Sequence, residues 1–342
     1  MPEANADSVR ELDVVVWGAT GFTGRLVAEY LLRTYGIGGR LRWALGGRNE
    51  AKLTTLRREI CTAAGGDEGA LPLVVGDAAD PASMVELAQR TRVVCTTVGP
   101  YAKYGTPLVA ACARTGTDYC DLTGEVQWMR RIIDTHHEEA RASGARIVHT
   151  CGFDCIPADI GVHFVQQQMR ARHGAVSARV KYRVKGFRGG ASGGTIASMM
   201  NMLDEASQDS SVLRVINDPY GLNPEGQRSG SDVGDRTAPA YDADFEQWTG
   251  PFVMAAVDTR VVRRTNALLG YPYGRDFRYD EAMLMGAGPV GLAKAVGLTA
   301  TLGASMAALQ FGGLRRLAAR RLPEPGEGPS REQQEKGYFD VR

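Results

Sequence analysis

Three glycines spaced three residues apart form the motif in this chain that most directly implies chemistry. Gly18, Gly21 and Gly24 lie in the segment GATGFTG, between the apolar run LDVVVW and an amphipathic segment. The first glycine would let the chain turn off a strand, the second would let the backbone approach a pyrophosphate, and the third would let a helix lie close to a sheet. The motif therefore predicts a dinucleotide site at a helix N-terminus. The residues expected to hold the dinucleotide there are Gly18, Thr20, Gly21, Phe22, Thr23 and Gly24.

The residues after the second predicted strand indicate which dinucleotide binds. An NAD site usually offers a carboxylate there to the ribose hydroxyl groups, whereas this strand ends Gly46-Gly47-Arg48. An arginine can form a charge-assisted pair with a 2′-phosphate. NADP(H) is therefore favoured over NAD(H); the alternative is that Arg48 only borders a solvated helix start. Asp77, after the third predicted strand, is expected either to accept a hydrogen bond from the adenine amino group or to cap a helix.

A further group of residues follows the fourth predicted strand, at the edge where sheets of this kind bind their ligands. Val98, Gly99 and Pro100 are expected to border the nicotinamide. Tyr101 and Lys103 come next and are the predicted catalytic residues, because they could polarise a carbonyl or deliver a proton. The alternative is a surface turn with aromatic packing, and the proton donor stays open.

Other polar clusters favour structural roles. The run His136-His137-Glu138-Glu139 lacks the i, i+4 histidine pair of a zinc protease and is expected on a solvated helix face. Cys151 and Cys155 do not have the usual spacing of a zinc-binding cysteine pair, so no metal site is predicted. Three carboxylates at strand-to-helix junctions are expected to be either caps or pocket residues: Asp121, Glu125 and Asp154.

A parallel sheet is needed to bring these residues together. Over the first 150 residues apolar runs alternate with amphipathic segments, which is typical of a Rossmann-type doubly wound α/β fold. The predicted strands are 12–17, 41–45, 73–75, 92–98, 118–120 and 146–149, and the main predicted helices are 22–33, 52–60, 84–88, 106–115 and 125–142. We therefore expect an NAD(P)-binding domain at 10–155.

A second, mixed α/β substrate domain is expected at 156–322. Asp159 is predicted to cap a helix over 159–172, and residues 178–185 alternate like a half-buried strand. Residues 208–250, rich in Asp, Ser, Gly and Pro, are predicted to form a long loop or lid. Residues 323–342 are expected to be a polar linker leading into the start of a strand, as in a truncated version of a longer chain.

The segment 295–314 carries no charged residue over twenty positions. That length is compatible with a membrane span, but four glycines, two threonines, a serine and a glutamine dilute it, and Lys294 precedes it. A buried or interfacial helix is the favoured prediction, with peripheral association at the plasma membrane as an alternative.

Composition narrows the class of protein. The chain has 342 residues with 40 basic and 39 acidic side chains, so its net charge of +1 gives no global reason to bind nucleic acid. Six thinly spread cysteines exclude a disulfide scaffold. The polar N-terminus shows no signal or transit peptide, so a cytoplasmic location is expected. The oligomeric state is not indicated.

Six segments carry a resemblance to known proteins, in chain order GATGFTGRLVAEYL, GGR, TTVGPYAKYGTPLVAAC, YCDLTGE, CGFDCIPADIG and SGGT. Together they resemble the saccharopine dehydrogenase-like oxidoreductases, and within them the trans-acting enoyl reductase group. The resemblance is dense over residues 11–200 and thinner beyond. It implies an N-terminal NAD(P)-binding domain followed by a mixed α/β domain around the substrate.

The resemblance also implies a reaction. Members of this group are expected to reduce an α,β-unsaturated acyl thioester on a carrier protein of a polyketide synthase, during glycolipid biosynthesis, with a hydride going from the nicotinamide to the β-carbon. Two alternatives stay open. One is an oxidoreductase acting on a small amino-acid-type substrate, and the other is a non-catalytic dinucleotide-binding scaffold at a lipid surface.

Overall fold

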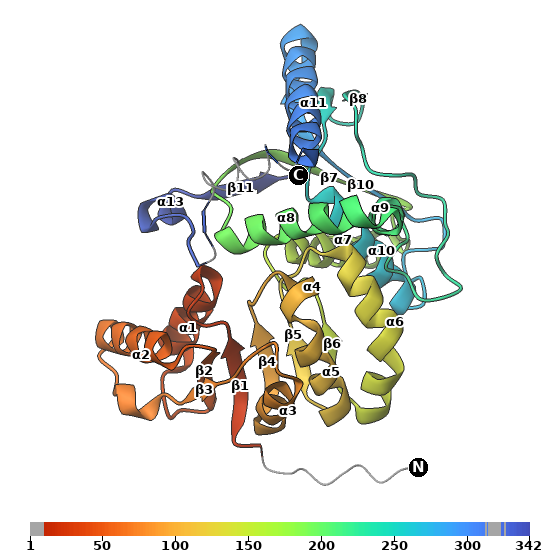
Figure 1. Cartoon of the computed structure of the whole chain (residues 1–342). Coiled ribbons are helices and arrows are strands. Elements are labelled where there is room, and N and C mark those ends of the chain that lie inside the picture. Colours follow the sequence, from red (N-terminus) through yellow and green to blue (C-terminus); the bar gives the residue numbers. More distant parts are fainter. Residues whose placement is uncertain (1–9, 312, 314–322, 325) are drawn as a thin grey trace.

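A parallel sheet of six strands forms the first part of the molecule (Figure 1). The computed structural model describes residues 10–311, 313, 323–324 and 326–342. The strand order is β3-β2-β1-β4-β5-β6, which confirms the predicted doubly wound fold because the winding reverses between β1 and β4. The strands are β1 Leu12–Trp17, β2 Trp43–Gly47, β3 Leu73–Val75, β4 Thr91–Thr96, β5 Asp118–Cys120 and β6 Ile147–Val148.

Helices cover both faces of this sheet. One face carries α1 (Phe22–Tyr35) and α2 (Glu50–Ala64), and the other carries α3 (Pro81–Arg90), α5 (Thr106–Thr115) and α6 (Val126–Ser143). A short 3-10 turn, η1 (Glu68–Ala70), precedes β3. Asp80 caps α3 through its side chain, and Pro81 follows it in the first turn.

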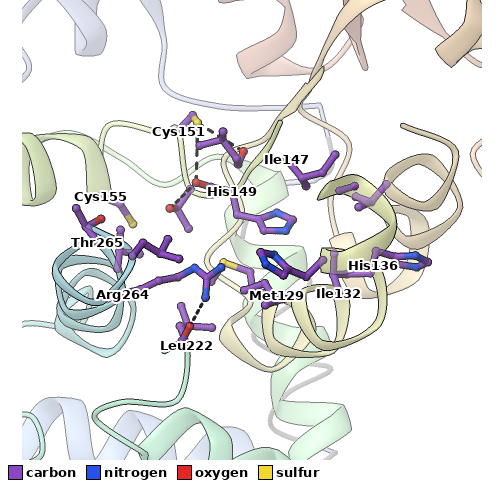
Figure 2. A pocket seen from close by; sticks show the side chains of 18 of the residues that line it. Met129, Ile132, His136, Ile147, His149, Cys151, Cys155, Leu222, Arg264 and Thr265 are labelled. Carbon is purple, nitrogen blue, oxygen red and sulfur yellow. Dashed lines mark hydrogen bonds between the residues drawn. The ribbon is translucent and has the colours of Figure 1, made fainter. Parts of the chain in front are cut away.

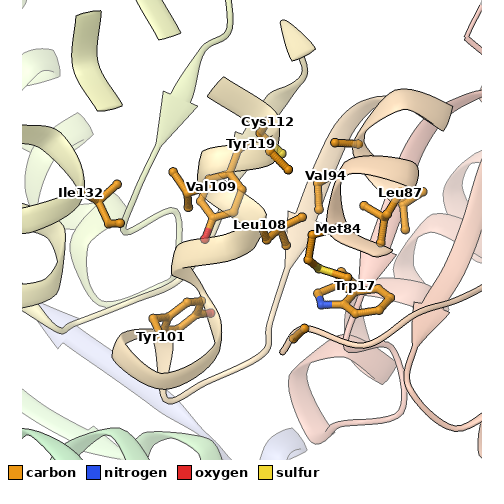
Figure 3. Packing of buried hydrophobic residues seen from close by; sticks show 14 of the residues in the cluster. Trp17, Met84, Leu87, Val94, Tyr101, Leu108, Val109, Cys112, Tyr119 and Ile132 are labelled. Carbon is orange, nitrogen blue, oxygen red and sulfur yellow. The ribbon is translucent and has the colours of Figure 1, made fainter. Parts of the chain in front are cut away.

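The strand side chains alternate between two apolar cores. Val16 and Leu45 pack under α1 and α2, whereas Val15, Trp17 and Val94 pack on the other face (Figure 3). Because both faces are covered, these strands are continuous apolar runs rather than alternating ones.

A second, mixed sheet has the strand order β11-β7-β10-β9-β8. β7 and β10 are parallel, and the other neighbours are antiparallel. The strands are β7 Arg179–Arg188, β8 Ala240–Asp242, β9 Gln247–Gly250, β10 Arg278–Gly286 and β11 Tyr338–Val341. This sheet confirms the mixed α/β character expected of the second part.

The helix α7 (Cys155–His173) packs with α10 (Ala255–Leu268) beside this sheet. The prediction that Asp159 begins α7 was wrong, because Asp159 lies inside the helix. Pro157 is the third residue of α7, where its missing N–H removes no intrahelical hydrogen bond. The proline therefore lies inside the first turn of α7, and the helix does not begin after it.

Residues 208–250 are not a loop throughout, so that prediction was also wrong. They contain α9 (Ser210–Asn217), β8 and β9. Two buried arginines of α10 hold the backbone between these elements: Arg263 donates to Asp232 at 2.7 Å, and Arg260 pairs with Asp235. Because a buried charge needs a partner, these ion pairs order a segment whose composition resembles a loop.

The segment 323–342 ends in the strand that its last residues predict, but the predicted linker before that strand contains a helix. Its described residues include α13 (Arg331–Glu335), which begins with a capping box, and β11, which pairs with β7. Arg331 forms an ion pair with Glu29 of α1, and the backbone of Glu327 accepts a hydrogen bond from that of Gly193. The segment therefore connects the second sheet with the first helix of the parallel sheet.

Two further helices matter for function. The helix α8 (Gly193–Gln208) lies between the two sheets, and α11 (Gly288–Gln310) projects from the body of the molecule (Figure 1). Among the described residues, α11 is the one helix long and apolar enough to cross a membrane by length and composition, and 6% of its apolar window is buried. The segment 295–310 is thus helical as predicted. Apart from Ala295 it is mostly exposed, so the prediction of a buried helix was wrong and that of an interfacial helix stays a prediction. Positions 312 and 314 lie outside the described residues.

Candidate functional site

The glycine motif forms the turn between β1 and α1. Gly18 has a φ of +88°, a conformation that favours glycine. A Cβ atom on Gly24 would lie 2.2 Å from the carbonyl oxygen of Gly18, so only glycine lets α1 lie this close to the end of β1. Gly21 is the N-cap of α1 and has no side chain to satisfy the first-turn N–H groups. The helix start therefore keeps donors and a favourable dipole for a phosphate.

The other predicted residues of this turn lie around the same helix start. Thr20 is exposed, and Thr23 is half-buried in the first turn of α1. The backbone of Gly328 lies against the ring of Phe22: a Cβ atom on Gly328 would lie 2.4 Å from that ring. The C-terminal segment thus forms part of the wall of the predicted phosphate site.

The end of β2 carries the predicted selector of the dinucleotide. Arg48 is exposed between Gly47 and the N-cap Asn49 of α2. Among the described residues, no carboxylate forms an ion pair with Arg48, so its guanidinium is available to an external anion. Asp77 is exposed after β3 and accepts a hydrogen bond from the backbone N–H of Ala79 at 3.0 Å. It therefore forms a turn before α3, and its predicted contact with adenine stays a prediction.

The turn after β4 lies directly beside the glycine motif. The hydroxyl of Thr97 donates to the Gly18 carbonyl at 3.2 Å, and its backbone N–H donates to the Trp17 carbonyl at 2.9 Å. A Cβ atom on Gly18 would lie 2.6 Å from a methyl group of Val98. The peptide bond between Gly99 and Pro100 is cis. The predicted nicotinamide border and the predicted phosphate loop are therefore adjacent.

The two predicted catalytic residues lie in very different surroundings. Tyr101 begins α4 (Tyr101–Tyr104), is 3% exposed, and donates its hydroxyl hydrogen to the Thr96 carbonyl at 3.3 Å (Figure 3). Burial raises the pKa of its phenol well above the usual value. This placement favours the packing alternative for Tyr101. Lys103 is exposed on the same short helix and remains a candidate.

Two more polar groups lie beside this turn: Glu125, which the sequence predicts to be either a cap or a pocket residue, and a hydroxyl group that sequence reasoning missed. Glu125 accepts hydrogen bonds from the backbone N–H groups of Tyr101 and Ala102 at 2.8 and 2.9 Å, so it caps α4 from another part of the chain. Burial raises its pKa, and the Ser198 hydroxyl of α8 donates to it. A Cβ atom on Gly99 would lie 3.1 Å from the Ser198 oxygen. No local signal predicts Ser198, because it reaches the turn only through the packing of α8.

The residues after β5 and β6 form a separate buried polar group. Asp121 accepts from the Tyr119 hydroxyl at 2.9 Å and from the Thr150 backbone at 2.9 Å, and it contacts His149 Nδ1 at 2.7 Å. Asp121 therefore organises the ends of two strands. Across the described residues, no group of three or more His, Cys, Asp or Glu side chains is placed to hold a metal ion.

The geometry at the β1, β2 and β4 ends fits a bound NADP(H). The close approach at Gly24 leaves the α1 N-terminus open to a pyrophosphate, and the end of β2 presents a cation and no carboxylate. The Val98–Pro100 turn lies at the switch point, where a nicotinamide would lie against it.

Comparison with known proteins shows the family. Residues 14–148 match the family model of the saccharopine dehydrogenase NADP-binding domain. A protein of Mycobacterium tuberculosis (strain ATCC 25618 / H37Rv) is 42% identical over 97% of this chain and 80% of its own length. Proteins named trans-acting enoyl reductase, from Mycobacterium leprae (strain TN) and Mycobacterium ulcerans (strain Agy99), are 40% and 39% identical over 96% of this chain and 80% of their own lengths. The chain belongs to the saccharopine dehydrogenase-like oxidoreductases, in the trans-acting enoyl reductase group. It is an NADP(H)-dependent oxidoreductase by family.

Solved structures give a more distant likeness. The saccharopine dehydrogenase (L-Glu forming) of Saccharomyces cerevisiae aligns with 63% of this chain and 38% of its own, at 17% identity and a TM-score of 0.36.

Proposed function

We propose that this oxidoreductase reduces an α,β-unsaturated acyl thioester presented by a carrier protein of a polyketide synthase. The observation that supports this most directly is the site at the β1 and β4 ends, together with the likeness to proteins named trans-acting enoyl reductase. A role in glycolipid biosynthesis is part of the proposal.

The proposed binding residues of NADP(H) are those of the glycine turn and the ends of β2 and β4. We assign the phosphates to the first turn of α1 and the 2′-phosphate to Arg48. Bound NADPH supplies the hydride for the β-carbon. The chain must then hold the thioester carbonyl and allow a proton to reach the α-carbon.

Two side chains beside the Val98–Pro100 turn are proposed to act on the thioester. Ser198 and Lys103 both carry hydrogen-bond donors. Ser198 lies against Gly99, and its one hydroxyl hydrogen, which goes to Glu125 in the free protein, is proposed to turn to the thioester oxygen when the substrate binds. A donor at the carbonyl oxygen stabilises the negative charge that forms there when hydride adds to the β-carbon. Tyr101 has no such access, since its hydroxyl faces the Thr96 carbonyl.

The first test is calorimetric titration of the purified chain with NADPH and with NADH, followed by addition of an enoyl thioester while the absorbance of the reduced nicotinamide is recorded. We expect tight NADPH binding and loss of absorbance with the thioester. Turnover of a free amino-acid imine instead would favour the small-substrate alternative. Binding of NADPH without turnover of any thioester would favour the scaffold alternative.

The catalytic assignment is tested by Ser198→Ala and Lys103→Met. Loss of one donor from a site of this kind lowers kcat by about 10²-fold when it contacts the reacting oxygen. The dissociation constant of NADPH should not change, because neither side chain lies at the phosphate loop. An unchanged kcat in both variants would contradict the assignment.

Peripheral association with an anionic lipid surface is a second part of the proposal. The helix α11 carries no charge from Ala295 to Gln310, and its side chains at Val290, Val296 and Met306 are 66%, 49% and 46% exposed. At about 1.5 Å per residue its 23 residues extend over roughly 34 Å. Four arginines follow in the sequence, at positions 315, 316, 320 and 321, and basic residues next to an apolar helix favour anionic headgroups.

Sedimentation with phosphatidylglycerol vesicles tests this association. The full chain should bind, and the triple variant Val290→Ser, Val296→Ser, Met306→Ser should not. A matched control replaces three exposed apolar residues elsewhere, Val75, Phe164 and Leu213, by serine and should leave binding unchanged. Equal binding of both variants would contradict a role of α11 at the lipid surface. If the full chain and the control were dimers in solution and the α11 variant a monomer, the helix would instead bind a second copy of the chain.

A further inference from the structure

A cavity of about 400 Å³ lies at the outer edge of the parallel sheet, away from the glycine turn. Its walls are α6, the end of β6, the start of α7 and the last turns of α10 (Figure 2). Most of the lining is apolar and includes Met129, Ile132, Ile147 and Val261. Its volume is in the range of small-molecule sites, which are about 300 to 1,000 Å³.

Two aromatic rings separate this cavity from the proposed cofactor site. The ring centroids of Tyr101 and Trp128 are 5.5 Å apart, and that of Trp128 lies 5.2 Å from that of His149. Trp128 is fully buried, and its indole N–H donates to the Thr106 hydroxyl. The cavity is therefore a separate space, with His149 on its side of the aromatic wall.

His149 offers this cavity a polar atom without a partner. Its side chain is 9% exposed and lines the cavity, with Nδ1 held by Asp121 at 2.7 Å. Within the part of the chain that the structure describes, its Nε2 has no hydrogen-bond partner. A buried polar atom left unpaired is costly, and a ligand that pairs with it removes that cost.

Arg264 brings a positive charge to the same space. Its side chain extends from α10 toward His149 and Met129 (Figure 2), and it donates to the Leu222 carbonyl at 2.5 Å. No carboxylate of the described residues forms an ion pair with it, and burial lowers its pKa. Asp134 attracts the guanidinium only over a longer distance, and it already pairs with Arg130 and Arg228. The partly buried guanidinium is therefore expected to attract an anion.

One carboxyl group, Asp159, faces the cavity as well. It accepts from the Thr265 hydroxyl at 2.9 Å, and its other oxygen has no partner in the described structure. Burial raises its pKa, so it opposes a ligand's negative charge less than an exposed aspartate would. The available charge therefore favours an anion near Arg264.

We propose that this cavity binds a carboxylate with a hydrocarbon chain, its head at Arg264 and His149 and its chain against the apolar side chains of α6. The apolar lining excludes a fully hydrated anion as the preferred ligand, and a guanidinium that forms no ion pair within the described residues disfavours a neutral hydrocarbon. The site is independent of the proposed reduction, because the aromatic wall separates the two.

Calorimetric titration of the full chain with octanoate, octanol and inorganic phosphate tests this site. Octanoate should bind about tenfold more tightly than octanol, as one charge-assisted hydrogen bond would require. Phosphate should bind far more weakly than octanoate. Equal affinities of octanoate and octanol, or of octanoate and phosphate, would overturn the proposal.

Variants locate the binding. Arg264→Met should weaken octanoate binding about tenfold and leave octanol binding unchanged, whereas the exposed control Arg58→Met should change neither. Because Arg264 is partly buried, Val148→Trp provides a second variant: Val148 is 50% exposed at the cavity, and the larger ring should block it without altering the core. Retained NADPH binding reports that each variant is folded. Unchanged octanoate affinity in both variants, or competition between octanoate and NADPH, would overturn the proposal.

Discussion

The two sheets of this chain are stabilised by different kinds of buried side chain. The parallel sheet lies between two apolar cores, in which Val15, Val16 and Leu45 are fully buried. The mixed sheet instead buries Arg183 completely, between Asp242 at 2.8 Å and Asp280 at 2.6 Å. Apolar packing tolerates many sequences of similar volume, whereas a buried ion pair requires each partner in place. The second part should therefore be the more sensitive to single charge changes.

The largest expected effect is that of Arg183→Met. Removing the guanidinium leaves Lys181 as the ion-pair partner of the buried Asp242, and leaves Asp280 with the longer contact to Arg236 at 3.7 Å. The free energy of unfolding should therefore fall by about 3 to 5 kcal/mol. Urea unfolding measures it. The exposed pair of Arg58 and Glu68 is the control, and Arg58→Met should cost less than about 0.5 kcal/mol. Similar losses of stability in Arg183→Met and Arg58→Met would mean that the buried ion pairs of the mixed sheet stabilise it no more than an exposed pair does.

In the apolar part, Gly24→Val tests the close approach of α1 to β1. The added side chain would meet the Gly18 carbonyl and Ala19, so we expect a loss of about 1 to 3 kcal/mol in stability and loss of NADPH binding. Gly161 in α7 has open space where a Cβ would lie, and Gly161→Ala should stabilise the helix by up to about 1 kcal/mol. Wild-type NADPH affinity in Gly24→Val would mean that the turn does not bind the pyrophosphate.

Acid should act on the mixed sheet through Asp242. Burial raises its pKa, but the hydrogen bonds from Lys181 and Arg183 outweigh burial and lower the pKa to about 2, from 3.8. The stability that this carboxylate contributes is therefore present above about pH 4 and is lost as the pH falls through 2, a change of about 2 kcal/mol. Between pH 4 and pH 2 the free energy of unfolding should fall less for Asp242→Asn than for the wild type, as measured by urea unfolding at each pH. The exposed control Asp276→Asn should keep the wild-type slope.

The smallest expected effect is a change of cofactor preference in Arg48→Asp. Loss of a charge-assisted pair with the 2′-phosphate should weaken NADPH binding about tenfold or more and move preference toward NADH. Titration with both dinucleotides measures this. Arg58→Asp, in the helix α2 that follows Arg48, is the control and should leave the cofactor preference unchanged. An unaltered NADPH affinity in Arg48→Asp would assign the 2′-phosphate elsewhere.

Much of the first part could be predicted from the sequence because its signals are local. Leu12–Trp17 is a continuous apolar run, and it forms β1 with the same bounds. The glycine spacing gave the turn, since φ values and close approaches restrict residue type at single positions. The second part was harder to predict, because Arg183 and Arg260 are buried at positions where a hydrophobic pattern expects exposure.

The sequence by itself determined the doubly wound fold, the glycine turn and the cation at the end of β2, because each depends on residues close together in the chain. Only the tertiary structure placed Ser198 against Gly99, turned the Tyr101 hydroxyl into the core and brought Arg264 near His149. These placements depend on which helices pack together, and contacts between residues far apart in the chain leave no periodic signal in the sequence.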